Sequence, residues 1–310
     1  MDLGLRGKVA LVTGASKGIG RGIAEELAAE GADVAICARG KAGLDEAVEA
    51  LEGHGVRAVG IPADAAVAAD VEEVVQGTLD AFGRIDILVN NAGDAWFGRM
   101  LETTDEQWAA ALDINLYSAV RFTRAVVPHM RAQGGGRIIN VNTVGAHSPI
   151  VGMVDYETAK AGLLAFAKTM ANELAADGIL VNSVCPALIQ TPLWDRLADS
   201  MIGTAGASRE EVFTNLATQF VPLARFGTVD EVAGLVAFLA SDAAKDVTGQ
   251  VFGVRGKEIM LFNHMRPVRS IHDDRGWTPE RLAEMFPGTL RHHLAPLETS
   301  GQFFNYDPLV

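Results

Sequence analysis

Short apolar runs alternate with longer stretches of helical periodicity along most of this 310-residue chain, and that alternation constrains its fold more than any other feature. The runs are continuously apolar, which is typical of parallel strands buried on both faces. The pattern predicts a doubly wound α/β fold, a parallel seven-stranded sheet with helices on both faces. We expect strands at residues 9–12, 34–38, 56–61, 85–89, 137–141, 179–184 and 250–254, and helices at 19–30, 67–82, 107–133, 156–177 and 229–241.

The alternation ends near residue 261, and the sequence beyond it is rich in His, Pro and Arg. One helix is expected there, because Thr278 suits the N-cap and Pro279 suits the first helical position. The stretch holds too few apolar residues to form a core of its own. We therefore predict a single domain over residues 1–261, followed by a C-terminal extension over 262–310 that packs at a subunit interface or borders a pocket.

The composition argues against several classes of protein. The formal net charge is −13 and no long basic run appears, so nucleic acid is not an expected partner. The two cysteines, Cys37 and Cys185, lie in separate apolar strands without CxxC spacing, which favours neither a disulfide framework nor a metal site. No apolar window reaches the length of a membrane span. We expect a cytoplasmic protein that binds no metal and contacts no membrane.

A glycine-rich turn connects the first predicted strand to the first predicted helix. It reads TGASKGIG at residues 13–20. Glycines allow the backbone to approach a pyrophosphate, whose charge then meets the N-terminus of the helix. A glycine cluster alone indicates only a tight turn, but the strand–turn–helix context is the one that a dinucleotide site requires. The turn therefore predicts a bound dinucleotide.

The end of the second predicted strand indicates which dinucleotide. An acidic residue there would bind the ribose 2′-hydroxyl of NAD(H), but Ala38 takes this place and Arg39 follows it. Lys17 in the glycine-rich turn adds a second cation. Two cations and no carboxylate favour a 2′-phosphate, and hence NADP(H) rather than NAD(H). The alternative is that both side chains are solvated surface charges.

Tyr156 and Lys160 are four residues apart at the start of a predicted helix, so both lie on one helical face. A tyrosine titrates near pH 10 in water, and a nearby ammonium stabilises the phenolate and lowers that pKa. The pair could then exchange a proton with a substrate near neutral pH. On its own, this spacing is commonly only a solvated helical face.

Further motifs surround this pair in a fixed order. The TGxxxGxG turn follows the first strand, NNAG follows the fourth at residues 90–93, and YxxxK opens a long helix. Other matching positions are Asp64, Asn115, Thr143, Pro186 and Thr191. With these motifs the chain resembles the short-chain dehydrogenase/reductase family over residues 5–255. The resemblance implies a Rossmann-type fold, an oxidoreductase that acts on CH–OH groups, and a homo-oligomer, either a dimer or a homotetramer.

The resemblance also implies roles for individual residues. Tyr156 would donate a proton to the substrate oxygen during reduction and remove it during oxidation. Lys160 would lower the pKa of Tyr156 and hold the nicotinamide ribose, while Asn115 would anchor a water of the proton relay. Thr143 would bond the substrate oxygen. The implied cofactor contacts are Gly14, Ser16, Lys17, Gly18, Ile19, Gly20, Arg39, Asp64, Ala65, Asn91, Ala92, Gly93, Tyr156, Lys160, Pro186, Ile189 and Thr191.

The chain departs from the family pattern in three places. Thr143 stands where the family usually has serine; it keeps the hydroxyl but adds a methyl that restricts the rotamer. Asn142 and Ser148 are alternatives for that role. Ala187 replaces the glycine of the usual Pro-Gly pair. The sequence RGK at residues 255–257 replaces a glycine pair near which most relatives end.

Loops at the carboxyl ends of the strands should line the substrate pocket, with residues 192–220 as its lid. The candidates are mostly apolar: Trp96, Phe97, His147, Pro149, Ile150, Met153, Leu188 and Trp194. We therefore expect a small apolar carbonyl or alcohol substrate. It could be a 3-oxoacyl or 3-hydroxyacyl thioester, a steroid, or an alicyclic ketone.

Two other functions compete with a ketone/alcohol oxidoreductase. One is a dinucleotide-binding protein without turnover, against which the intact Tyr156, Lys160 and Asn115 argue. The other is an epimerase or dehydratase of nucleotide sugars from the extended branch of the superfamily. That branch usually shows TGxxGxxG, which the glycine spacing at residues 14–20 does not fit.

Overall fold

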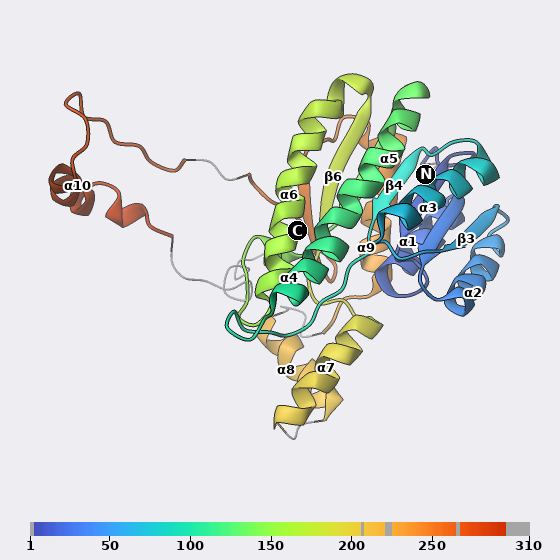
Figure 1. Ribbon diagram of the computed structural model, residues 1–310, viewed down its shortest axis with the longest axis horizontal. Helices are drawn as coiled ribbons and strands as arrows, with labels where there is room; N and C mark the ends of the chain where they lie inside the picture. Colours follow the sequence, from blue (N-terminus) through green and yellow to red (C-terminus); the bar gives the residue numbers. More distant parts are fainter. Residues whose placement is uncertain (1–2, 206–207, 221–224, 265–266, 296–310) are drawn as a thin grey trace.

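Eight strands form one sheet in the described part of this computed structural model, which covers residues 3–205, 208–220, 225–264 and 267–295 (Figure 1). The strand order is β3-β2-β1-β4-β5-β6-β7-β8. The strands are β1 (Val9–Thr13), β2 (Asp33–Ala38), β3 (Ala58–Pro62), β4 (Ile87–Asn90), β5 (Gly136–Val141), β6 (Ile179–Pro186), β7 (Val251–Arg255) and β8 (Glu258–Leu261). β1 to β7 are parallel and follow the seven predicted runs, so the predicted fold class is confirmed.

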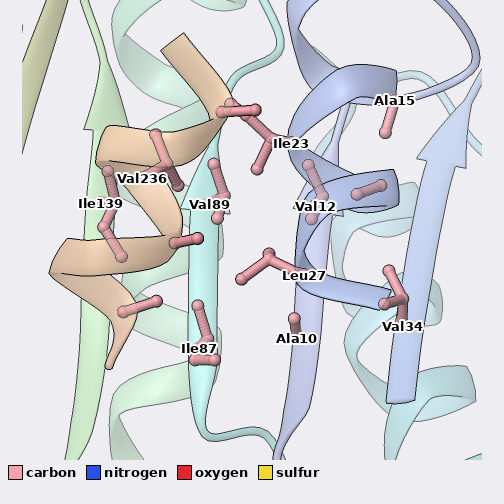
Figure 2. Close-up of a cluster of buried hydrophobic side chains, with 14 of the residues drawn as sticks. Ala10, Val12, Ala15, Ile23, Leu27, Val34, Ile87, Val89, Ile139 and Val236 are labelled. Atoms are coloured by element: carbon pink, nitrogen blue, oxygen red, sulfur yellow. The ribbon is translucent and has the colours of Figure 1, made fainter. Parts of the chain in front are cut away.

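Helices cover both faces of the sheet. One face carries α1 (Gly18–Ala29), α2 (Lys41–Glu52) and α9 (Val229–Ala240), and the other carries α3 (Ala68–Phe82), α5 (Ser118–Ala132) and α6 (Val154–Leu174). In Figure 2, Ile23 of α1 and Val236 of α9 project toward Val12 and Val89 on the central strands. These four side chains are fully buried, and burying one such side chain contributes about 2 kcal/mol. α1 and α9 therefore bury one face of the central strands.

The eighth strand is not predicted by the sequence analysis. β8 runs antiparallel to β7 after a tight turn at Gly256, whose φ of 61° suits glycine. Its side chains alternate, with Met260 buried and Ile259 half exposed. A four-residue alternating strand lacks the continuous apolar run that identifies the other strands. It extends the sheet beyond the predicted seven strands.

The predicted helix at residues 107–133 contains an irregular turn. α4 (Asp105–Leu112) and α5 are joined by a π-helical turn, Asp113–Tyr117. Thr104 and Gln107 form a capping box that begins α4. π-Turns insert an extra residue and occur often at functional sites. Here the turn contains Asn115, which is buried.

Two helices occupy the predicted lid, α7 (Pro192–Ala205) and α8 (Arg209–Phe220). In Figure 1 they project from one end of the sheet. Residues 206–207, within the predicted lid, lie outside the described residues. The role of a lid remains a prediction at this point.

The extension contains the predicted helix. α10 (Pro279–Met285) begins at Thr278, whose hydroxyl accepts the N–H of Arg281 (3.2 Å). α10 lies apart from the sheet in Figure 1. Residues 265–266 and 296–310 lie outside the described residues. The division into one domain and an interface or pocket-bordering extension stays a prediction.

No helix in the described ranges combines the length and the apolar character that crossing a bilayer would need.

Candidate active site

Hydrogen bonds join the ends of β1 and β4 and thereby fix the glycine-rich turn. The Thr13 hydroxyl accepts the N–H groups of Asn91 (3.0 Å) and Ala92 (2.9 Å). The Asn91 side chain donates back to the carbonyls of Thr13 (2.9 Å) and Gly14 (3.1 Å). A Cβ on Gly20 would lie 2.4 Å from Asn91 Nδ2, so only glycine fits there. Gly20 and Asn91 therefore shape the turn rather than line the groove beside it.

A groove of about 1080 Å³ runs along the ends of β1 to β4. Lys17 and Arg39 are both exposed at this groove. Predicted cofactor residues that line it are Gly14, Ser16, Lys17, Gly18, Arg39, Asp64, Ala65, Ala92 and Gly93. Arg21 and Trp96 also line it, and the sequence analysis missed both in this role. The groove therefore adjoins the glycine-rich turn between β1 and α1, where the glycine pattern predicted a bound dinucleotide.

Tyr156 and Lys160 lie on the first turns of α6. Lys160 is buried, and its ammonium donates to the carbonyl of Val141 (3.0 Å) and lies 6.0 Å from the centre of the Tyr156 ring. A Cβ on Gly93 would lie 3.4 Å from Lys160 Nζ and 2.8 Å from Asn115 Oδ1. Both side chains thus converge on Gly93, at the end of the cofactor groove.

Burial shifts the pKa values of both members of this pair. Burial raises the pKa of Tyr156 above its ordinary value, and the hydrogen bond from Thr143 lowers it only in part. Burial lowers the pKa of Lys160 to about 8. The net shift of Tyr156 is upward because desolvation of the phenolate is the largest effect, and the lowering of its pKa by Lys160 stays a prediction. The upward shift of the Tyr156 pKa favours the neutral phenol.

Asn115 is fixed by the loop after β4. Its amide donates to the carbonyl of Asp94 (2.8 Å) and to that of Ala111 (3.1 Å), and its oxygen accepts the N–H of Asp94 (3.2 Å). The Asp94 carboxylate forms a close ion pair with Arg196 of α7. One loop residue therefore connects the predicted relay residue to the predicted lid.

A second cavity, of about 490 Å³, adjoins Tyr156. The predicted site residues that line it are Ile19, Thr143, Tyr156, Pro186, Ile189 and Thr191. The predicted apolar pocket residues that line it are Phe97, Ile150, Met153, Leu188 and Trp194. Helices α7 and α8 contribute further apolar side chains, among them Leu197 and Leu216. This is the candidate substrate cavity.

Three residues predicted for the substrate pocket lie elsewhere. Trp96 lines the cofactor groove, and Pro149 lines a neighbouring cavity. The His147 ring stacks on Phe262, with 4.1 Å between ring centres. Neighbouring loop residues point to opposite sides, which the linear sequence does not reveal.

Thr143 occupies the position at which the family usually has serine. Its side chain hydrogen-bonds Tyr156 and accepts the N–H of Gly145 (3.2 Å). Both polar groups of the Asn142 side chain, the alternative to Thr143, form hydrogen bonds. Its amide donates to the carbonyl of Lys160 (3.0 Å), and its oxygen accepts the N–H of Thr143 (2.9 Å). Asn142 therefore positions the loop, and Thr143 is the residue bonded to Tyr156.

Glu157 is a site residue that the sequence analysis missed. Its carboxylate accepts the N–H of Ile150 through both oxygens (2.9 and 3.1 Å). Gly145 leaves room for it, because a Cβ there would lie 2.5 Å from Oε1. Burial raises the pKa of Glu157 to about 7. Its position directly after Tyr156 is the sequence signal that could have identified it.

Within the described ranges, His, Cys, Asp and Glu side chains do not gather in groups of three that could hold a metal ion.

Comparisons with known proteins agree with this geometry. The family model for enoyl-(acyl carrier protein) reductase, of the short-chain type, matches residues 14–256. A 3-oxoacyl-[acyl-carrier-protein] reductase from Synechocystis sp. is 40% identical over 259 residues, which are 83% of this chain and 99% of the relative. The chain belongs to the short-chain dehydrogenase/reductase family. The predicted reaction class, interconversion of a ketone and an alcohol, is thereby confirmed.

Solved structures of other short-chain dehydrogenase/reductases are similar throughout the sheet. L-sorbose reductase from Gluconobacter frateurii, solved with NADPH and L-sorbose, is 38% identical with a TM-score of 0.80 and covers 83% of this chain and 98% of its own. An actinorhodin polyketide ketoreductase solved with NADPH is 37% identical with a TM-score of 0.77, covering 80% and 96%.

We predict that Gly20→Ala disrupts the cofactor groove. The new Cβ would collide with Asn91 Nδ2 and with the Gly14 carbonyl, 2.6 Å away, so the turn must shift. Affinity for NADPH, measured by fluorescence titration, should fall about tenfold or more, equivalent to about 1.4 kcal/mol. Gly234→Ala, an exposed helical glycine with nothing within 4 Å, is the control and should bind as the parent does.

We predict that Glu157→Gln changes how stability depends on pH. The folded pKa of about 7 lies above the unfolded value near 4.5, so the parent loses stability as pH rises from 4.5 to 7. Glutamine still accepts the Ile150 N–H but does not ionise. Relative to the parent, the variant should gain on the order of 2 kcal/mol between pH 5 and pH 8 in urea unfolding. The exposed Glu72→Gln is the control, and parallel pH curves for all three proteins would contradict the assignment.

Proposed function

We propose that this short-chain dehydrogenase/reductase is an NADP(H)-dependent enzyme that interconverts a ketone and a secondary alcohol on an apolar substrate, such as a 3-oxoacyl or 3-hydroxyacyl thioester. Tyr156 and Thr143 meet in the wall of an apolar cavity, with Lys160 beside Gly93 at the end of the cofactor groove. That arrangement is the main support for the proposal. In this arrangement Tyr156 would serve as a proton donor between a bound dinucleotide and a ketone.

The groove fits NADP(H) in shape and in charge. A Cβ on Gly14 would lie 2.9 Å from the Cα of Ala92, so glycine lets the turn pack closely against the loop after β4. Gly14, Ser16 and Gly18 line the groove at the start of α1, where a pyrophosphate would bind. Lys17 and Arg39 offer two cations for a 2′-phosphate, and Ala38 brings no carboxylate. The two solved relatives contain NADPH. When bound, this cofactor would supply the hydride for the carbonyl carbon.

The chain's own residues would handle the proton. Tyr156 would donate its phenolic proton to the carbonyl oxygen, and Thr143 would hydrogen-bond that same oxygen. The raised pKa of Tyr156 keeps the proton in place until the oxygen becomes more basic. Lys160 would bind the nicotinamide ribose and, through the water anchored by Asn115, restore the proton from solvent. The neutral phenol suits the reduction direction.

The apolar walls support the substrate class. Phe97, Met153, Leu188 and Trp194 surround the space next to Tyr156. The 3-oxoacyl reductases among the relatives favour an acyl thioester over the steroid or alicyclic ketone that the same walls could hold. Helices α7 and α8 would form the lid over residues 192–220. We also propose that the protein forms a homodimer or homotetramer.

We predict that Tyr156→Phe abolishes turnover but keeps cofactor binding. The variant lacks the donated proton, so kcat for a ketone should fall by about 10²- to 10⁴-fold. The Kd for NADPH should stay close to that of the parent, because the hydroxyl faces the substrate cavity. A screen of oxoacyl thioesters, steroids and cyclic ketones supplies the assay. A parent that binds NADPH but reduces none of them would favour the non-catalytic alternative.

We predict that Arg39→Ala weakens selection for the 2′-phosphate. Loss of a charge-assisted hydrogen bond should raise the KM for NADPH about tenfold and leave the KM for NADH nearly unchanged. Lys41→Ala, which removes an exposed cation paired with Asp45, is the control. Equal catalytic efficiency of the parent with NADPH and NADH would overturn the cofactor assignment.

A further inference from the structure

The first residues of the C-terminal extension stay bound to β7 after β8 has ended. The N–H of Phe262 donates to the carbonyl of Val251 (2.9 Å), which continues the pairing of the two strands by one residue. A Cβ on Gly253 would lie 2.9 Å from Cε2 of Phe262, so the ring packs directly against the backbone of β7. His264 Nε2 donates to the carbonyl of Gly249 (2.8 Å). The extension therefore begins as part of the sheet, although α10 lies apart from it (Figure 1).

The ring of Phe262 stacks on a residue of the candidate active site. Its plane lies at 7° to that of His147, with 4.1 Å between the ring centres. His147 is the C-cap of a short 3-10 turn, Val144–Ala146, and its N–H donates to the carbonyl of Val144 (3.1 Å). Stacking limits how the two rings can move relative to one another. Phe262 therefore fixes one end of this turn.

The other end of the same turn is Thr143. Its side chain hydrogen-bonds Tyr156, and its carbonyl accepts the N–H of Ala146 (3.2 Å). The residue that bonds Tyr156 and the residue that stacks on Phe262 are thus the two ends of one hydrogen-bonded turn. A shift at one end must therefore move the other.

β8 supports the middle of the turn. Val144 is buried in an apolar cluster with Met260 of β8, and with Cys185 and Val251 of the neighbouring strands. Most members of the family end near residues 255–257, so Met260 and Phe262 are contacts that this chain adds. The added contacts meet the turn that also carries the threonine departure. A threonine needs a fixed rotamer to aim its hydroxyl, because its methyl group competes for the same space.

We propose that Phe262 is a positioning residue, which acts through His147 to hold the Thr143 hydroxyl where it bonds Tyr156 and the substrate oxygen. This inference rests on the proposed function, because it concerns the step in which Tyr156 donates its proton. A displacement of about 1 Å in a reacting group can lower a rate by about 10²-fold. The start of the extension thus contributes to the chemistry of its own chain without touching the substrate.

The test asks whether Phe262 and Thr143 act on the same step. We measure reduction of ethyl 3-oxohexanoate by NADPH in the parent, in Phe262→Ala, in Thr143→Val and in the double variant. Thr143→Val should lower kcat about 10²-fold, and Phe262→Ala about tenfold. The double variant should match Thr143→Val, because the hydroxyl that Phe262 positions is already absent. The Kd for NADPH, from fluorescence titration, should stay at the parent value throughout.

Further variants separate positioning from folding. His147→Ala removes the other ring of the stack and should lower kcat as Phe262→Ala does. Phe262→Tyr keeps the stack and should restore the parent kcat. Trp277→Ala changes an aromatic residue of the extension that lies beside α10, and it should keep the parent kcat. Melting temperatures show that each variant folds.

The outcomes distinguish this positioning role from the proposed function. A folded Phe262→Ala variant with the parent kcat would overturn the role. Equal losses from Phe262→Ala with and without the Thr143 hydroxyl would also overturn it, because the ring would then act on the fold in general. A Thr143→Val variant as fast as the parent would remove the role and leave ketone reduction through Tyr156 in place. A parent that reduces no ketone would contradict the proposed function, and this inference with it.

Discussion

The whole site depends on the hydrogen bonds between the end of β1 and the end of β4. Four hydrogen bonds cross this junction: two between Thr13 and Asn91, one from the Ala92 N–H to the Thr13 hydroxyl, and one from the Asn91 amide to the Gly14 carbonyl. Parallel strands offer no direct connection between their ends, so side chains must fix how the loops lie relative to one another. The β1 loop forms the dinucleotide groove, and the β4 loop continues to Gly93, where Lys160 and Asn115 converge. The same hydrogen bonds therefore position both the dinucleotide groove and the loop that contacts Lys160 and Asn115.

Burial decides the chemistry of the residues that these hydrogen bonds position. Desolvation raises the pKa of Tyr156 and lowers that of Lys160, so each group is pushed toward its neutral form. The same loop reaches the lid, because Asp94 holds Asn115 through its backbone and Arg196 through its carboxylate. That ion pair is partly exposed and contributes little stability. The ion pair instead fixes the position of α7 relative to the loop that binds Asn115, the predicted relay residue.

The sequence predicts the central fold well because buried parallel strands appear in it as short, continuous apolar runs. The seven runs are predominantly apolar, whereas β8 exposes Ile259 and follows a turn made possible by Gly256. Motif spacing likewise locates Tyr156, Lys160 and the glycine-rich turn. It does not locate Trp96 or His147, because adjacent loop residues point to different cavities. Nor does it give the balance between desolvation and charge that sets the pKa of Tyr156, since that balance depends on burial.

The same topology explains why a departure near the end of the family pattern alters the substrate cavity. Seven parallel strands deliver their following loops to one edge of the sheet, where ligands bind. β7 ends at that edge, and β8 returns from it in the opposite direction. Of the hairpin residues, Arg255 lines the cavity beside Tyr156. A glycine pair there would leave this edge without a side chain, whereas the Arg255 guanidinium is buried at the cavity wall and bound to the Glu258 carboxylate.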